Sequence, residues 1–147
     1  MNYIKDWLIP DLRNLEAKRS SLAHMLEEIQ TLKLEAESIK ATDYDRITVS
    51  GGGNNTQEDK LITNIAKREE LEANYEVTRH EVESLDSLLS ELRDDERLIL
   101  ERMFIKRERN AAEALAVTLG YEVRNVYRKK DDALHNLARR RFGQVKL

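Results

Sequence analysis

The sequence predicts an all-α protein with two parts: a long antiparallel helical hairpin of the coiled-coil type over residues 1–93, and a helix-turn-helix over residues 94–147. Charged residues make up 36% of the 147 positions, aromatic residues only 5%, and proline occurs once, which suits long charged helices rather than sheets. Apolar residues recur in steps of three and four along two long segments, the spacing of a coiled-coil seam. Gly120 separates two shorter apolar patterns, as a helix that stops and turns requires.

The first arm of the hairpin is predicted over residues 3–41. One seam position repeats every seventh residue, at Leu8, Leu15, Leu22, Ile29 and Ala36. In the later heptads the second seam position is filled by Met25, Leu32 and Ile39. Asp11 and Lys18 interrupt this second position early in the arm. Pro10 is expected either to open the main helix or to kink it after a short turn over residues 3–9.

The second arm is predicted over residues 57–92, with a more regular seam at Leu71, Tyr75, Thr78, Val82, Leu85, Leu89 and Leu92. Leu61, Ile62 and Ile65 extend its apolar face toward the start of the arm. Two arms of similar length joined by one loop favour antiparallel pairing within the chain. Because a narrow seam on two helices makes a thin core, we expect a homodimer in which two hairpins form a four-helix bundle.

The connecting loop, residues 42–56, is rich in glycine and is interpreted as a flexible hairpin tip. Its glycines at 51–53 are not a phosphate-binding loop, because no Gly-Lys-Ser/Thr sequence follows them. Residues 46–49 have the composition of a short extended segment. Thr56 and Asp59 have the spacing of a weaker capping box, which predicts that they open the second arm. Contact of this loop with DNA or RNA polymerase is the alternative interpretation.

A helix-turn-helix is predicted in the second part of the chain. Asn110 and Glu113 have the spacing of a capping box for its first helix. Leu115 and Leu119 lie four residues apart on one face of that helix. The second helix is predicted over residues 123–141. The small core that holds the two helices at their angle is predicted to contain Leu98, Met103, Phe104, Leu115, Leu119, Val126 and Leu134.

Basic and amide side chains gather on the second of these helices, at Arg124, Asn125, Arg128, Lys129, Arg139, Arg140 and Arg141. The first four lie near its N-terminus, where a recognition helix in the major groove presents side chains to base edges and phosphates. The three consecutive arginines are expected to contact the phosphate backbone, which makes binding salt-dependent.

The net charge differs between the two parts of the chain. Residues 1–93 carry 12 Lys and Arg against 19 Asp and Glu, a net charge of −7, whereas residues 94–147 carry 13 against 9, a net charge of +4. This asymmetry predicts double-stranded DNA as the partner of the second part; a small helical bundle that merely contains a Leu-Gly turn is the alternative.

Small and apolar residues of this part have a characteristic order, at Ala116, Leu119, Gly120, Val126, Ala133, Leu134 and Leu137. In this order they resemble region four of bacterial sigma factors, the module that reads the upstream promoter element. Residues 95–100 resemble the earlier helix of that module. The resemblance implies a sigma region-four-like helix-turn-helix. Glu122 departs from the pattern, because the family usually has a Ser or Thr helix cap there; a carboxylate complements the helix dipole but repels phosphate.

The predicted hairpin, the loop with Tyr44-Asp45-Arg46-Ile47 and three glycines, and the sigma-like second part occur in this order. Together they resemble the RinA and ArpU type regulators of bacteriophages that infect Gram-positive bacteria. The resemblance covers nearly the whole chain at the level of organisation. It implies a transcriptional activator of late phage genes that acts in the cytoplasm of the bacterial host.

An enzyme is not expected. His24, His80 and His135 lie on separate predicted helices without a nucleophile or a ligand cluster beside them. The chain contains no Cys, which excludes a disulfide framework and a thiolate metal site. No catalytic residue, metal site or cofactor is therefore predicted. No stretch approaches the about 20 apolar residues that a membrane span needs, and the first residues do not form a signal peptide, so no membrane partner and a cytoplasmic location are expected.

Two other functions remain open at this point. One is a DNA-packaging protein that resembles a terminase small subunit, for which an oligomer well beyond a dimer would be expected. The other is an interaction protein that uses its sigma-like fold to bind RNA polymerase without reading DNA itself. Promoter occupancy that depends on polymerase would favour the second alternative.

Overall fold

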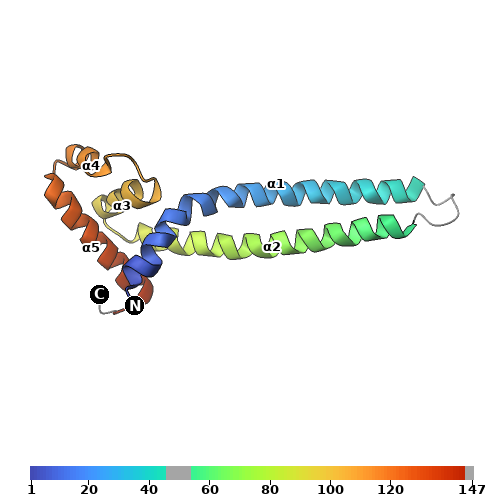
Figure 1. The fold of residues 1–147 in the computed structure, drawn as a ribbon, viewed down its shortest axis with the longest axis horizontal. Coiled ribbons are helices and arrows are strands. Elements are labelled where there is room, and N and C mark those ends of the chain that lie inside the picture. The colour runs from blue at the N-terminus through green and yellow to red at the C-terminus, as the bar shows by residue number, and fades with distance from the viewer. Residues whose placement is uncertain (46–53, 145–147) are drawn as a thin grey trace. The chain divides into compact units, whose positions relative to one another are not determined.

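The structure, a computed structural model, describes residues 1–45 and 54–144 (Figure 1). Within these residues all regular secondary structure is helical, which confirms the predicted all-α class. The elements are the α-helices α1, α2, α3, α4 and α5 and two short π-helical segments, η1 and η2, with the bounds η1 Ile4–Leu8, α1 Ile9–Asp45, α2 Asn54–Ser90, α3 Asp94–Leu100, η2 Glu101–Ile105, α4 Ala111–Leu119 and α5 Val123–Phe142. None of the described helices is both long and apolar enough to cross a membrane.

Contacts between residues divide the chain into two compact units. One unit combines Met1–Arg19 with Glu81–Leu147, and the other is Ser20–His80. The division therefore falls within α1 and α2, whereas the sequence placed its boundary at residues 93 and 94. In consequence, the first turns of α1 and the last turns of α2 belong to the same unit as α3, α4 and α5.

Both long helices extend into the segment predicted as a loop over residues 42–56. α1 continues to Asp45, and the Thr42 hydroxyl donates a hydrogen bond to the Ser38 carbonyl within it. α2 begins at Asn54, so Thr56 lies inside the helix and the predicted capping box of Thr56 and Asp59 is wrong. The predicted extended segment at 46–49 and the glycines at 51–53 lie outside the described residues.

In the Ser20–His80 unit, α1 and α2 pack antiparallel (Figure 1). The predicted seam of α1 is correct here, since Leu22, Met25, Ile29, Leu32, Ala36 and Ile39 are buried or half-buried. On α2 the predicted Leu61, Leu71, Tyr75 and Thr78 are half-buried, whereas the predicted Ile62 and Ile65 are exposed. The same stripe also contains Gln57 and Asn64, which are buried and were not predicted. Buried Asn64 is satisfied: its amide donates to the Leu32 carbonyl at 2.8 Å, and its oxygen accepts from Arg68 Nε at 3.0 Å.

In the other unit, the start of α1 is anchored by Leu8, Leu12 and Leu15, all of which are buried. Leu12 completes the seam that Asp11 had appeared to interrupt. The π-helical turn η1 lies directly before Pro10, with the Ile9 amide bonded to the Ile4 carbonyl. A proline ring cannot fit against the carbonyl four residues earlier in a regular α-helix, and the wider π turn accommodates it without ending the helix.

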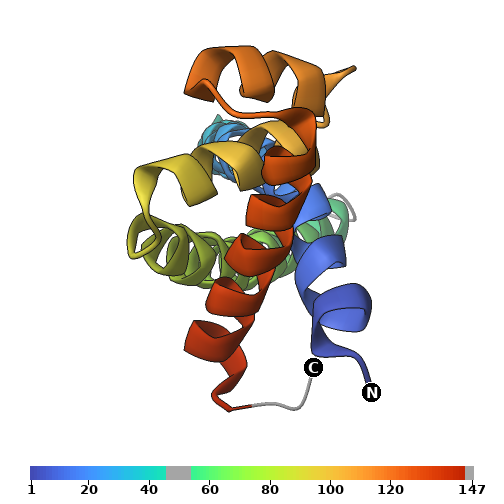
Figure 2. The ribbon, with the colours of Figure 1, turned by 90° about the vertical axis from the view of Figure 1, so that its left-hand side faces the viewer.

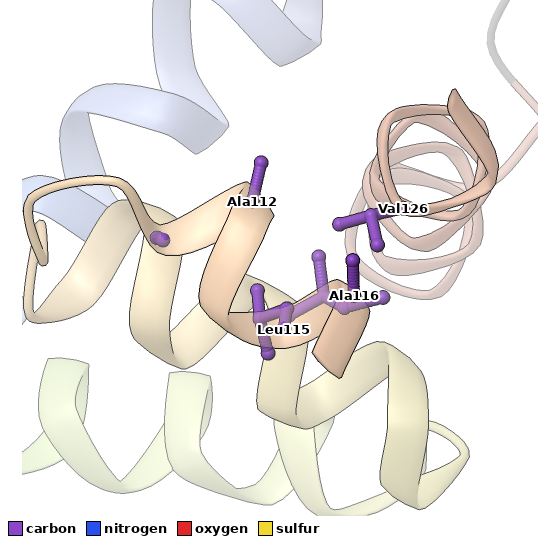
Figure 3. Close-up of a cluster of buried hydrophobic side chains, with 6 residues drawn as sticks. Ala112, Leu115, Ala116 and Val126 are labelled. Carbon is purple, nitrogen blue, oxygen red and sulfur yellow. The ribbon is translucent and has the colours of Figure 1, made fainter. Parts of the chain in front are cut away.

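The remaining core of this unit lies between α3, α4 and α5 (Figure 2). Its buried cluster runs along α4 (Figure 3) and contains Ile99, Ala111, Ala112, Leu115, Ala116 and Val126. Of the predicted core, Phe104, Leu115, Val126 and Leu134 are buried, and Leu98, Met103 and Leu119 pack against the cluster while partly exposed. The alanines of α4 were missed because small residues give a weak apolar signal, yet they allow α5 to approach closely.

Replacing Leu115 by Ala should destabilise this core by about 2–5 kcal/mol, because the fully buried side chain leaves a cavity that alanine cannot fill. Val117 provides a matched control on the same helix, since its side chain is 85% exposed. We expect Val117→Ala to change the free energy of unfolding by no more than about 0.5 kcal/mol. Urea unfolding followed by circular dichroism measures both, and equal effects would contradict the assigned faces of α4.

Candidate nucleic-acid interface

A tight turn connects α4 to α5. Gly120 ends α4 with φ +70°, a left-handed conformation that favours glycine. The Ala116 carbonyl accepts hydrogen bonds from the amides of both Gly120 and Tyr121, so the last turn of α4 is closed by backbone bonds. The predicted role of Gly120 is therefore confirmed.

The start of α4 differs from the prediction. Asn110 occupies the N-cap position but has φ +56°, and its side chain makes no capping hydrogen bond. Its backbone carbonyl instead accepts from the Ala114 amide at 3.1 Å. The proposed capping box of Asn110 and Glu113 is wrong, because a left-handed N-cap residue does not have the extended conformation that such a box requires. Asparagine is nonetheless a suitable residue here, since it tolerates this conformation better than most.

α5 begins after Glu122, whose extended backbone places its carbonyl to accept from the amides of Asn125 and Val126. The carboxylate of Glu122 is exposed and makes no capping bond. One face of α5 is buried along its whole length, at Val126, Ala133, Leu134, Leu137 and Ala138. This burial fixes the rotation of the helix and hence determines which of its polar residues face outward.

Lys129 does not project freely from α5. Its ammonium donates to Asp95 Oδ2 of α3 at 3.1 Å and lies over the Tyr121 ring. The Tyr121 hydroxyl donates to the same oxygen at 3.1 Å, and Asp95 Oδ1 accepts from the Glu96 amide. Partial burial opposes ionisation of Asp95, but these hydrogen bonds outweigh it and hold the pKa of the carboxyl below its ordinary value of 3.8. The hydrogen bond to Asp95 in turn raises the pKa of Lys129.

Two of the three consecutive arginines are also bound within the unit. Arg141 Nη2 lies 2.6 Å from Asp11 Oδ2, and its guanidinium covers the ring of Phe142. Arg140 Nη1 lies 3.4 Å from Glu91 Oε2. These ion pairs join the end of α5 to α1 and to the turn that follows α2, within the same unit.

The remaining candidates divide between two faces of α5. Arg124, Arg128 and Arg139 are exposed, and no ion pair or hydrogen bond between described residues engages their side chains. In a helix of about 3.6 residues per turn, spacings of four and eleven place them on one face. Asp131 and Asp132 are exposed between Arg128 and Arg139. Asn125 is half-buried one turn before Lys129, on the flank directed toward α3.

Three further side chains near this surface were not singled out by the sequence reasoning. Arg109, just before α4, is exposed and has no ionic partner among the residues that the structure describes; the basic run over residues 106–109 was its signal. Val123 and Tyr127, in the first two turns of α5, are 37% and 45% exposed. The helical pattern alone had assigned neither of them to core or surface.

A polar cleft of about 380 Å³ lies beside α5, lined by Arg93, Glu96, Lys129, Asp132, His135, Asn136 and Arg139. Asn136 donates to Glu96 Oε2 at 3.0 Å inside it, which joins α3 to α5 a second time. Over residues 1–45 and 54–144, no group of three or more His, Cys, Asp or Glu side chains is arranged to hold a metal ion. Comparison of the chain with protein-family models, curated proteins and solved structures yields no match.

The Asp95 cluster should give the protein a pH-dependent stability. Because the folded state binds the Asp95 proton more weakly than the unfolded chain does, this stabilisation is complete well above pH 3.8 and is lost as the pH falls through and below that value. Asp95→Asn should therefore lower the Tm at pH 7, and its difference from wild type should shrink toward pH 3. Thermal unfolding at a series of pH values measures this difference.

The adjacent residue Asp94 offers the matched control, since its side chain is 95% exposed and its carboxylate pairs with Arg97 on the surface. An exposed pair of this kind contributes little to stability, so Asp94→Asn should leave the Tm and its pH dependence close to wild type. A Tm difference for Asp95→Asn that stays constant between pH 7 and pH 3 would contradict the assigned ion pair.

Proposed function

We propose that this protein is a sequence-specific DNA-binding transcriptional regulator in which α4 and α5 form a helix-turn-helix and α5 lies in the major groove. The observation that carries the proposal is the pair Arg124 and Arg128, exposed and unpaired among the described residues, one turn apart in the first turns of α5. The major groove of B-DNA admits one α-helix, and an arginine there forms a bidentate pair with guanine. Carboxylates of the same unit pair with Lys129, Arg140 and Arg141. Arg124 and Arg128, by contrast, remain available to a ligand.

Further features support the same function. Arg109 precedes α4 and Arg139 lies farther along the exposed face of α5, where both are suited to phosphate contacts at the edges of a groove. The order of residues resembles region four of sigma factors, and the whole chain resembles the RinA and ArpU type regulators. From these resemblances we propose activation of late genes in a bacteriophage as the biological role, with host RNA polymerase as a possible second partner.

The proposal is tested by fluorescence anisotropy of the full chain on duplex DNA selected from a random-sequence pool. Arg128→Ala should weaken binding by about 1–3 kcal/mol and relax the preference at the base pair that it reads. Arg139→Ala should weaken all sequences alike and reduce the slope of log Kd against log salt by about one. Selection of no preferred sequence would contradict the proposed function.

Arg140→Ala is the matched control on the same helix. It removes the same charge, but from a guanidinium that already pairs with Glu91, so affinity, sequence preference and salt slope should stay near wild type. Equal losses for Arg128→Ala and Arg140→Ala would indicate that net charge, and not an oriented α5, determines binding. A ring-sized oligomer on DNA would favour the packaging function instead.

We also propose that the Ser20–His80 unit forms a homodimer. Among its described residues the buried apolar side chains are few, at Ile29, Leu32 and Ala36, while Leu34, Ile62 and Val77 are more than half exposed. A core of this size gains from burial against a second copy.

Light scattering at micromolar concentration should give the mass of two chains, and Ile62→Lys should shift the protein toward the monomer. Val117→Lys, a change at a still more exposed position outside this unit, should leave the mass unchanged. A monomeric wild-type protein throughout this concentration range would contradict the dimer.

A further inference from the structure

The first two turns of α5 expose two parallel stripes of different chemistry. Arg124 and Arg128 form a cationic stripe, and Val123 and Tyr127 form an apolar stripe beside it, each pair spaced by one turn. The side chains of the apolar stripe are 37% and 45% exposed. The two side chains are neighbours, so they form a small apolar patch on an otherwise strongly charged helix. An exposed apolar patch is more informative than a single exposed apolar residue.

The apolar stripe continues the buried face of α5 toward the N-terminus of the helix, because Val123 and Tyr127 lie eleven residues before Leu134 and Ala138, but its two side chains remain partly exposed. The buried face of α5 is formed by Val126, Ala133, Leu134, Leu137 and Ala138, and Val123 and Tyr127 are not among the side chains of the buried cluster. The Tyr127 ring makes a cation–π contact with Lys130, whose ammonium lies 5.7 Å from the ring centroid. The hydroxyl of Tyr127 makes no hydrogen bond within the described residues. The exposed part of the apolar stripe therefore remains available for contact with a partner.

In the major groove, the bases present one apolar group, the C5-methyl of thymine. The same groove presents the guanine O6 and N7 acceptors that suit arginine. A helix with one apolar and one cationic stripe is complementary to a groove in which both kinds of group lie side by side. We propose that Val123 and Tyr127 are specificity-determining residues that contact thymine methyl groups, beside guanines that are read by Arg124 and Arg128.

This inference rests on the proposed function, and it narrows the operator to a site that combines thymine and guanine in the stretch read by α5. Phosphate contact is not assigned to the stripe, because neither Val123 nor the ring of Tyr127 carries a charge that a phosphate would attract. The contact is therefore sensitive to one methyl group and insensitive to salt, unlike the contacts of the arginines.

The experiment uses the full chain and the preferred duplex selected from a random-sequence pool. Each thymine of that duplex is replaced singly by deoxyuridine, which removes only the C5-methyl, and Kd is measured by fluorescence anisotropy. Loss of one methyl contact should weaken binding about fourfold, from the transfer free energy of a buried methyl or methylene group. We expect this loss at one or more thymines, and the loss should persist at higher salt.

Variants assign the contact to its side chain. Val123→Ala or Tyr127→Ala should abolish the effect of deoxyuridine at the thymine that each side chain contacts, whereas Tyr127→Phe, which keeps the ring, should retain it. Val117→Ala is the matched control, because Val117 is exposed on α4, outside both the apolar stripe and the Ser20–His80 unit, and should leave every deoxyuridine effect unchanged. Both substitutions on α5 concern exposed side chains, and a melting curve of each variant verifies that it is folded.

Two results would overturn the inference while leaving the proposed function standing. The first is a tightly bound, selected site at which no deoxyuridine substitution weakens binding. The second is a deoxyuridine effect that persists unchanged in both Val123→Ala and Tyr127→Ala. Failure of the pool to yield any preferred sequence would overturn the inference and the proposed function together.

Discussion

The burial of one face of α5 is the constraint on which the rest of its unit depends. Val126, Ala133, Leu137 and Ala138 are wholly buried, and Leu134 nearly so. A helix fixed along a face of about three and a half turns cannot rotate, so the chemistry of its other faces follows from residue number alone. The close approach of α4 is possible because Ala116 presents a small side chain to Val126 of α5 (Figure 3). The exposed arginines and the apolar stripe are therefore held on a rigid support.

The same constraint explains why basic residues that look equivalent in the sequence differ in the structure. Ion pairs join α5 to Asp95 of α3, to Glu91 in the turn after α2, and to Asp11 of α1. Each of these carboxylates pairs with a cation, whose charge is then largely compensated within the unit. The positive charge counted over residues 94–147 thus overstates what a polyanion would meet, and the distribution of carboxylates on neighbouring helices decides which cations remain available.

The sequence predicted the helical class, both long helices and most of their buried stripes, because a period of three and four residues is a strong signal. It failed where the stripe is polar, as at Asn64, whose burial depends on a carbonyl supplied by another helix. It also failed at Asn110, since a left-handed N-cap has no signature distinct from a capping box. The pairing of Lys129 with Asp95 joins residues 34 positions apart, and no local pattern encodes such a contact.

The outward face of α5 also limits how much sequence one unit can read. Beyond Arg128 the face carries Asp131 and Asp132, which repel phosphates on either side of a groove. If α5 reads DNA, its reading surface is thus confined to the first two turns, a length of about 11 Å. That length corresponds to about three base pairs at 3.4 Å each, which is too few to mark one place in a genome. If the protein is a specific regulator, two or more such units must therefore bind together, and a dimer formed by residues 20–80 would supply them.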